Sequence, residues 1–157
     1  MGKIFLQSKV VLFVLFFNCA LSFLTNAQNK AKHLHQLNDL LINTVMVDFF
    51  SPPVASRIYC YTNSAFYECI RQDDQSLATF TGKINGLSMI PEAPKTSKVD
   101  NIIAACIAYS YVAQNLVGSE YKIEDWRKKF EDSLIQHTDA EIAKASLAYG
   151  RLVADSI

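Results

Sequence analysis

The run Ile102–Ala113 constrains the fold of this chain most, because every position in it except Ser110 is apolar. A helix over about 98–117 would be apolar nearly all round, and such a helix must be enclosed by other elements. It is too short to cross a bilayer, which takes about 20 predominantly apolar residues. We therefore expect a central, buried helix whose alanines allow close neighbours, opened by a capping box at Ser97 and Asp100.

Two amphipathic helices are predicted before this central helix. The first covers 34–50, where apolar residues recur at spacings of three and four. Its apolar face would carry Leu34, Leu37, Leu41, Val45 and Phe49. Ser51-Pro52-Pro53 ends it and starts the second, over 53–72, since serine can cap a helix and proline is tolerated in the first turn. The polar face of the second helix would carry Arg57, Tyr61, Ser64, Glu68 and Arg71.

Two more helices are predicted after the central one. Gly118 ends the central helix and Ser119 caps the next, whose stripe is Ile123, Trp126, Phe130 and Leu134. A capping box at Thr138 and Glu141 opens the last, whose stripe is Ile142, Ala145, Tyr149, Leu152 and Val153. The connection at 73–97 is expected to hold a short helix over 76–82 and a turn at Asn85-Gly86. No alternating strand pattern of useful length occurs, so we predict an all-α helical bundle of about five main helices.

The N-terminus has the order of a secretory signal peptide. Lys3 and Lys9 precede the unbroken apolar run Val10–Phe17, and Thr25-Asn26-Ala27 places small residues at a cleavage site. We expect residues 1–27 to be removed and the protein to be exported, to a periplasmic or extracellular location. A membrane anchor would need a longer apolar stretch, and a lipoprotein site at Cys19 lacks the usual small residues before it.

Composition excludes some partners. The chain has 15 Lys and Arg against 15 Asp and Glu, so no strong field attracts nucleic acid. After removal of residues 1–27, the remaining helical domain, 28–157, carries 13 basic and 15 acidic residues. We expect no nucleic-acid partner and no stable membrane span after signal cleavage.

Three cysteines follow the expected cleavage site: Cys60, Cys69 and Cys106. Export would permit disulfides, but an odd number leaves at least one thiol free or paired with another molecule. Cys60 and Cys69 cannot pair within one helix, because nine residues separate them by about 13 Å and a disulfide needs Cα atoms within about 7 Å. All three are interpreted as small core residues.

The histidines predict no metal site. His33 and His35 are two residues apart and so do not share a helix face, and His137 is expected in a loop before Thr138. Asp73-Asp74 fits a solvated turn. No glycine-rich phosphate loop or nucleophile elbow occurs. No catalytic, cofactor-binding or metal residue is therefore assigned.

The run Val45–Tyr59 (VMVDFFSPPVASRIY) resembles the N-terminal helical region of bacterial vanadium-dependent haloperoxidase-like proteins, in the type-2 phosphatidic acid phosphatase superfamily. The likeness continues at Tyr61, Ala65, Tyr67-Glu68, Ile84-Asn85-Gly86-Leu87, 102–113 and Ala148-Tyr149-Gly150. The resemblance implies an all-α bundle and a parent activity of phosphate ester hydrolysis or halide oxidation.

In that family the bound group is vanadate or phosphate, held by a shell of Lys, two Arg, His, Ser and a backbone Gly amide. Those motifs are absent here: no Arg-Pro and no Pro-Ser-Gly-His occurs. The Ser56-Arg57 pair is followed by Tyr61 and Asn63 where the family motif has Gly and His. No catalytic residue is carried over, and no cofactor is expected in this chain.

Two functions from different classes follow. Since the family motifs lie in a C-terminal half, the first is an exported N-terminal scaffold fragment without a complete active site. The second is a short secreted helical binding module without catalysis. A fragment would expose an apolar face toward a missing C-terminal helical half, or self-associate through it. The expected faces are the uncapped last helix, at Tyr149, Leu152, Val153 and Ile157, and then the helix around 102–113.

Overall fold

The computed structural model describes residues 31–157, apart from Gln75, Ser88 and the side chains at 135 and 136. The predicted signal peptide, 1–27, lies outside the described residues. The chain divides into two compact units, Met1–His35 and Gln36–Ile157. Of the first unit, residues 31–35 are described and are helical. The fold below is that of the second unit.

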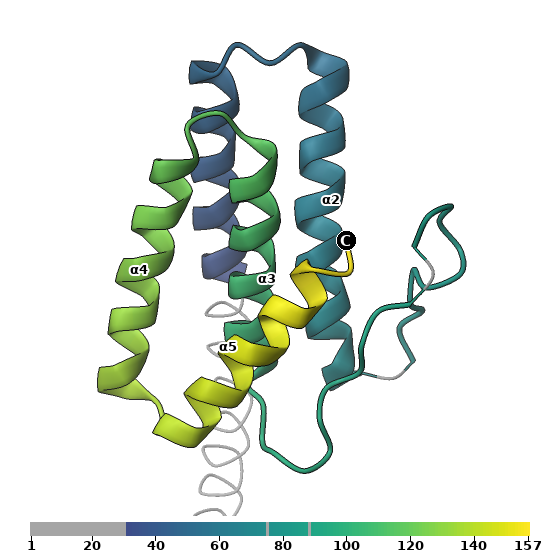
Figure 1. The fold of residues 1–157 in the computed structure, drawn as a ribbon, viewed down its shortest axis with the longest axis vertical. Coiled ribbons are helices and arrows are strands. Elements are labelled where there is room, and N and C mark those ends of the chain that lie inside the picture. The colour runs from purple at the N-terminus through teal and green to yellow at the C-terminus, as the bar shows by residue number, and fades with distance from the viewer. Residues whose placement is uncertain (1–30, 75, 88) are drawn as a thin grey trace, which may run out of the picture. The chain divides into compact units, whose positions relative to one another are not determined.

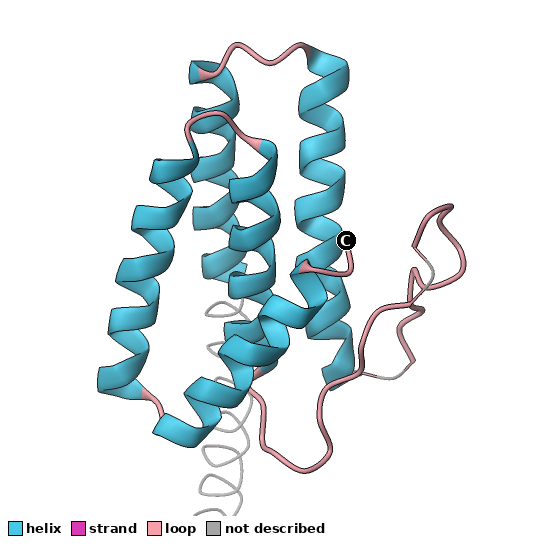
Figure 2. Cartoon of the chain, viewed as in Figure 1, coloured by secondary structure: helices cyan, strands magenta, loops and turns pink. Residues whose placement is uncertain are grey.

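Helices and loops make up the described part of the chain, and no strand occurs in it (Figures 1 and 2). A first helix runs through 31–47. It is followed by α2 (Pro52–Ile70), the 3₁₀ turn η1 (Arg71–Asp73), α3 (Asn101–Leu116), α4 (Glu120–His137) and α5 (Ala140–Ala154). The predicted all-α class with five main helices is confirmed.

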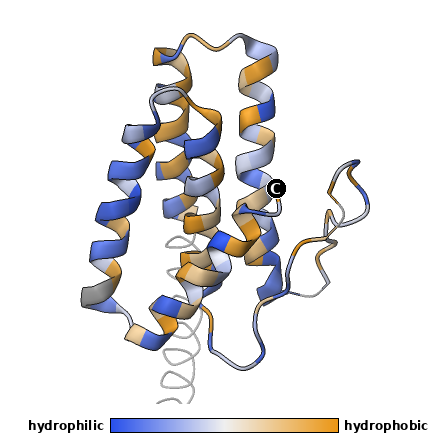
Figure 3. Cartoon of the chain, viewed as in Figure 1, coloured by the Kyte–Doolittle hydropathy of each residue, from blue (hydrophilic) through white to orange (hydrophobic). Residues whose placement is uncertain are grey.

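The helix α3 is the centre of the core, as its apolar composition predicts. Every side chain from Ile103 to Ser110 is buried. Of the helices α2, α4 and α5, the first and the last contact α3 most extensively, and α4 covers it less. Figure 3 shows the contrast with α4, where hydrophilic residues dominate. Burial on several sides is possible because many α3 side chains are alanines, which keep the neighbouring helix axes close.

The closest contact in the core lies between α5 and α3. A Cβ placed on Gly150 would stand 2.4 Å from the carbonyl oxygen of Ala104 and 2.9 Å from Cβ of Ile107. A real Cβ never comes that near a backbone oxygen, so a residue without a side chain is required at 150. The inward face of α5 is Ala143, Ser146, Tyr149, Gly150 and Val153.

The predicted stripe on α5 is therefore partly wrong. Leu152 is 56% exposed, whereas Tyr149 and Val153 are buried. The small residues at 146 and 150 set the line of contact with α3, and this rotation turns Leu152 outward. Two of the side chains expected on an uncovered face, Tyr149 and Val153, thus lie in the core, and α3 is enclosed as well.

For two helices, α3 and α5, the N-cap is a different residue from the one that the sequence predicted. The N-cap of α3 is Asp100 itself, whose Oδ1 accepts from the amides of Ile102 and Ile103 at 2.9 and 3.1 Å. The N-cap of α5 is Asp139, with equivalent bonds at 2.9 and 3.2 Å, while Thr138 ends α4. Carboxylates prevail over the hydroxyls because they are stronger acceptors for the free amides of a first turn.

The first helix ends earlier than predicted, and Phe49 is not on its apolar face. The amide of Phe50 donates to the carbonyl of Val45 and that of Phe49 to the carbonyl of Met46, both at 3.3 Å. These bonds form a Schellman motif, in which the residue at 49 must be left-handed. Phe49 has φ of 56° and is 93% exposed. Leu37, Leu41 and Val45 are buried as predicted.

Asp48 joins this turn to the start of α4. Its Oδ2 accepts from the amides of Gly118 and Ser119 at 2.8 and 3.0 Å, and its Oδ1 accepts from the Ser119 hydroxyl at 2.5 Å. Ser119 is the N-cap of α4, as predicted, but its hydroxyl bonds to Asp48 rather than to its own helix. Hydrogen bonds from Ser119 and Gly118 hold the pKa of Asp48 below its usual value.

The long connection between η1 and α3 is irregular. The predicted short helix at 76–82 is wrong, since this segment consists of turns, a bend and irregular backbone. The predicted turn at Asn85-Gly86 is confirmed, with φ of 91° at Gly86.

Ser51 stands at the N-cap of α2, as the sequence predicts, but its side chain makes no capping hydrogen bond. Across the described residues, none of the helices is long and apolar enough to cross a membrane.

We expect Gly150→Ala to lower the free energy of unfolding by about 2–3 kcal/mol, because the new methyl group overlaps a backbone oxygen that cannot move aside. Gly118→Ala is the matched control, since its Cβ would meet Asp48 at an ordinary 3.5 Å. Urea denaturation measures both variants. Equal stability of the two would contradict the close α3–α5 contact.

We expect Asp48→Asn to destabilise the chain by roughly 1 kcal/mol at neutral pH, through loss of a charged acceptor at a helix start. Because the folded pKa of Asp48 is lowered, its contribution is fully present above the unfolded pKa of about 3.9 and is lost as the pH falls through the folded value. The difference in Tm between wild type and variant should therefore shrink below about pH 4. A difference that is constant from pH 7 to pH 2.5 would rule out this role for the charge.

Candidate functional site

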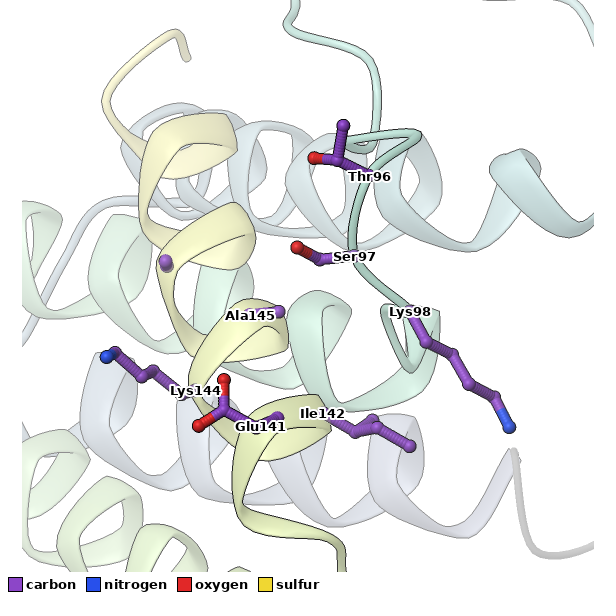
Figure 4. Close-up of a pocket in the computed structure, with 8 residues that line it drawn as sticks. Thr96, Ser97, Lys98, Glu141, Ile142, Lys144 and Ala145 are labelled. Atoms are coloured by element: carbon purple, nitrogen blue, oxygen red, sulfur yellow. The ribbon is translucent and has the colours of Figure 1, made fainter.

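A groove of about 440 Å³ lies between the segment 96–98 and the first half of α5 (Figure 4). Its lining residues are Thr96, Ser97, Lys98, Glu141, Ile142, Lys144, Ala145 and Ala148. In Figure 4 the side chains of Lys98 and Lys144 extend away from each other, and the Glu141 carboxylate lies beside the groove. Recognition of an oxyanion needs cationic donors that converge, so this groove lacks the geometry of an anion site.

A second cavity, of about 240 Å³, lies between α2, the turn at 84–87 and Ile157. It is lined by Cys60, Tyr61, Ser64, Ile84, Asn85, Gly86, Leu87 and Ile157, without a charged side chain. The prediction that Cys60 is a core residue is wrong, since this thiol is exposed. It lies on the exposed side of α2, whereas Ile58, Ala65 and Cys69 of the same helix are buried.

Cys69 and Cys106 are buried, as predicted, and all three cysteines are free thiols. Burial raises the pKa of Cys106 to about 12 and that of Cys69 still further. Both thiols therefore stay protonated near neutral pH, and a protonated thiol is a poor nucleophile and metal ligand. Neither buried cysteine supplies a reactive group.

The most completely bonded polar side chain is Glu68 of α2, which the sequence had placed on a polar face. It is fully buried. Its oxygens accept from Arg71 Nε at 2.5 Å, from the Thr79 hydroxyl at 3.1 Å and from the Phe80 amide at 2.6 Å. Tyr67 adds a bond to the carbonyl of Ala78 at 2.7 Å. Glu68 thus fixes the irregular connection onto α2, and its lone pairs are already occupied.

A second polar cluster joins α3, α4 and α5 around the ring of Tyr111. The guanidinium carbons of Arg127 and Arg151 lie 3.9 and 4.6 Å from its ring centroid. Arg127 also donates to Gln114 and pairs with Glu131 at 3.7 Å, and Arg151 donates to the Tyr111 hydroxyl at 3.1 Å. Cation–π contacts of this kind stabilise packing. Through these contacts both arginines hold their own helices against α3.

The histidines and acidic pairs are not brought together. His33 and His35 belong to the first unit, and His137 is the last residue of α4 rather than a loop residue, with Nδ1 2.9 Å from the Ser133 carbonyl. Asp74 forms a local turn with Ser76, and those bonds lower its pKa. Over residues 31–74, 76–87 and 89–157, no group of three or more His, Cys, Asp and Glu could hold a metal ion.

The partners of the arginines and of His137 indicate whether the described residues could hold vanadate or phosphate. Arg71 pairs with Glu68, and Arg127 and Arg151 stack on Tyr111. His137 is an exposed helix-end residue. A multiply charged anion needs several unpaired cationic donors around one point. The described side chains do not fit such a shell, so no catalytic step is derived through it.

The sequence predicted no bonding role for Asp48, and it placed Glu68 on a polar helix face. Asp48 follows a helix and precedes aromatic residues, and Glu68 stands among polar neighbours at helical spacing. Only Asp100 carried a signal, as part of a capping pattern. Apart from Arg71, three residues from Glu68, the partners of these two carboxylates lie too far along the chain for a local pattern to show: Gly118 is 70 residues from Asp48, and Phe80 is 12 residues from Glu68.

The chain is similar to a solved protein described as the first bacterial vanadium-dependent iodoperoxidase. The two share 32% sequence identity with a TM-score of 0.74, over 80% of this chain and 30% of the other. The matched region therefore spans less than a third of that structure. No protein-family model and no curated protein matched the sequence. The resemblance to vanadium-dependent haloperoxidase-like proteins inferred from the sequence is confirmed, for the helical part that this chain contains.

We expect Glu68→Gln to release the 76–82 segment, because the neutral amide leaves Arg71 unpaired and presents N–H groups to other donors. Breaking a buried pair in this way costs about 3 kcal/mol. Hydrogen exchange at the Phe80 amide should accelerate more than exchange in α3. Glu124→Gln, which removes an exposed pair with Lys128, should leave stability almost unchanged, because solvent screens an exposed ion pair. If Phe80 exchanges equally slowly in both variants, Glu68 does not anchor this segment.

Proposed function

We propose that this chain is the exported N-terminal scaffold part of a vanadium-dependent haloperoxidase-like protein, without a complete active site of its own. The observation that carries the proposal is the similarity to the iodoperoxidase, at 32% identity over 80% of this chain but 30% of that protein. A match of this kind supports a common helical scaffold, while the remaining 70% of that protein has no counterpart in the match.

The parent activity would be halide oxidation or phosphate ester hydrolysis. Both reactions place an oxyanion in a shell of cationic donors. In this chain the arginines at 71, 127 and 151 serve packing and loop attachment. The anion shell would therefore come from a C-terminal helical half, and the present helices would support it. Export rests on the order of charges and apolar residues in 1–27.

A second candidate is a short secreted helical binding module. The observation in its favour is the closed core: α3 is enclosed, and Tyr149 and Val153 of the last helix are buried. Five helices that enclose their own core can fold without a further half. The presence or absence of the Arg-Pro and Pro-Ser-Gly-His motifs in the downstream DNA separates the two candidates.

The proposal is tested on material collected from the exported fraction of a bacterial host that expresses the full chain. We expect mass spectrometry to give Gln28 as the N-terminus. We expect no vanadate binding by calorimetry, and no turnover of iodide with hydrogen peroxide or of p-nitrophenyl phosphate above a buffer blank. Activity that survives repurification would refute the absence of the anion shell. Retention of Met1 in soluble protein would refute signal cleavage.

A further inference from the structure

We draw no further inference here: the strongest candidate, the cavity of about 240 Å³ between α2, the turn at 84–87 and Ile157, where the exposed Cys60 thiol lies beside Tyr61 and Leu87, carries nothing, because a lone cysteine in an uncharged lining selects no ligand and nothing in the structure shows what covers it.

Discussion

The contact between Gly150 and the carbonyl oxygen of Ala104 is the constraint on which the rest of this fold depends. A glycine on α5 and an alanine on α3 bring two helix backbones into direct contact. Because α5 lies so close, Tyr149 and Val153 reach into the core beside α3, and the Ser146 hydroxyl accepts from the Asp100 amide at 2.8 Å. One small residue thus positions the last helix and orders the start of the central one.

Polar side chains attach the parts that apolar packing does not reach. Asp48 holds the end of the first helix to the start of α4, and Glu68 holds the irregular connection to α2. The cluster at Tyr111 does the same for α4 and α5, which otherwise share few contacts. Of these charged groups Glu68 and Arg127 are buried, and both have hydrogen-bond partners, as burial requires. These groups are therefore committed to structure rather than to chemistry.

This commitment bears on function. In the scaffold role proposed above, arginines and carboxylates would serve attachment, and the reacting groups would be supplied by another part of the protein. An enzyme that worked with these residues alone would need cations free to meet an anion, and Arg71, Arg127 and Arg151 are paired or stacked. The likeness to part of an iodoperoxidase and the lack of a converging anion shell among the described residues are consistent with each other.

The sequence by itself determined the class of fold, the central helix and the family resemblance. Helical periodicity is local, and a run such as 102–113 can only be buried, whatever its neighbours are. It failed where a local pattern had more than one outcome. Phe49 continues the apolar spacing of its helix, but the helix ends at 47 and the left-handed turn sends the ring outward. Leu152 fits its stripe, but contact through small residues rotates α5 away from it. The helical spacing places Glu68 on a solvated face, but the Thr79 hydroxyl and the Phe80 amide, 11 and 12 residues later, donate to its carboxylate and cover it. These outcomes depend on which backbone lies opposite, and only the tertiary structure decides that.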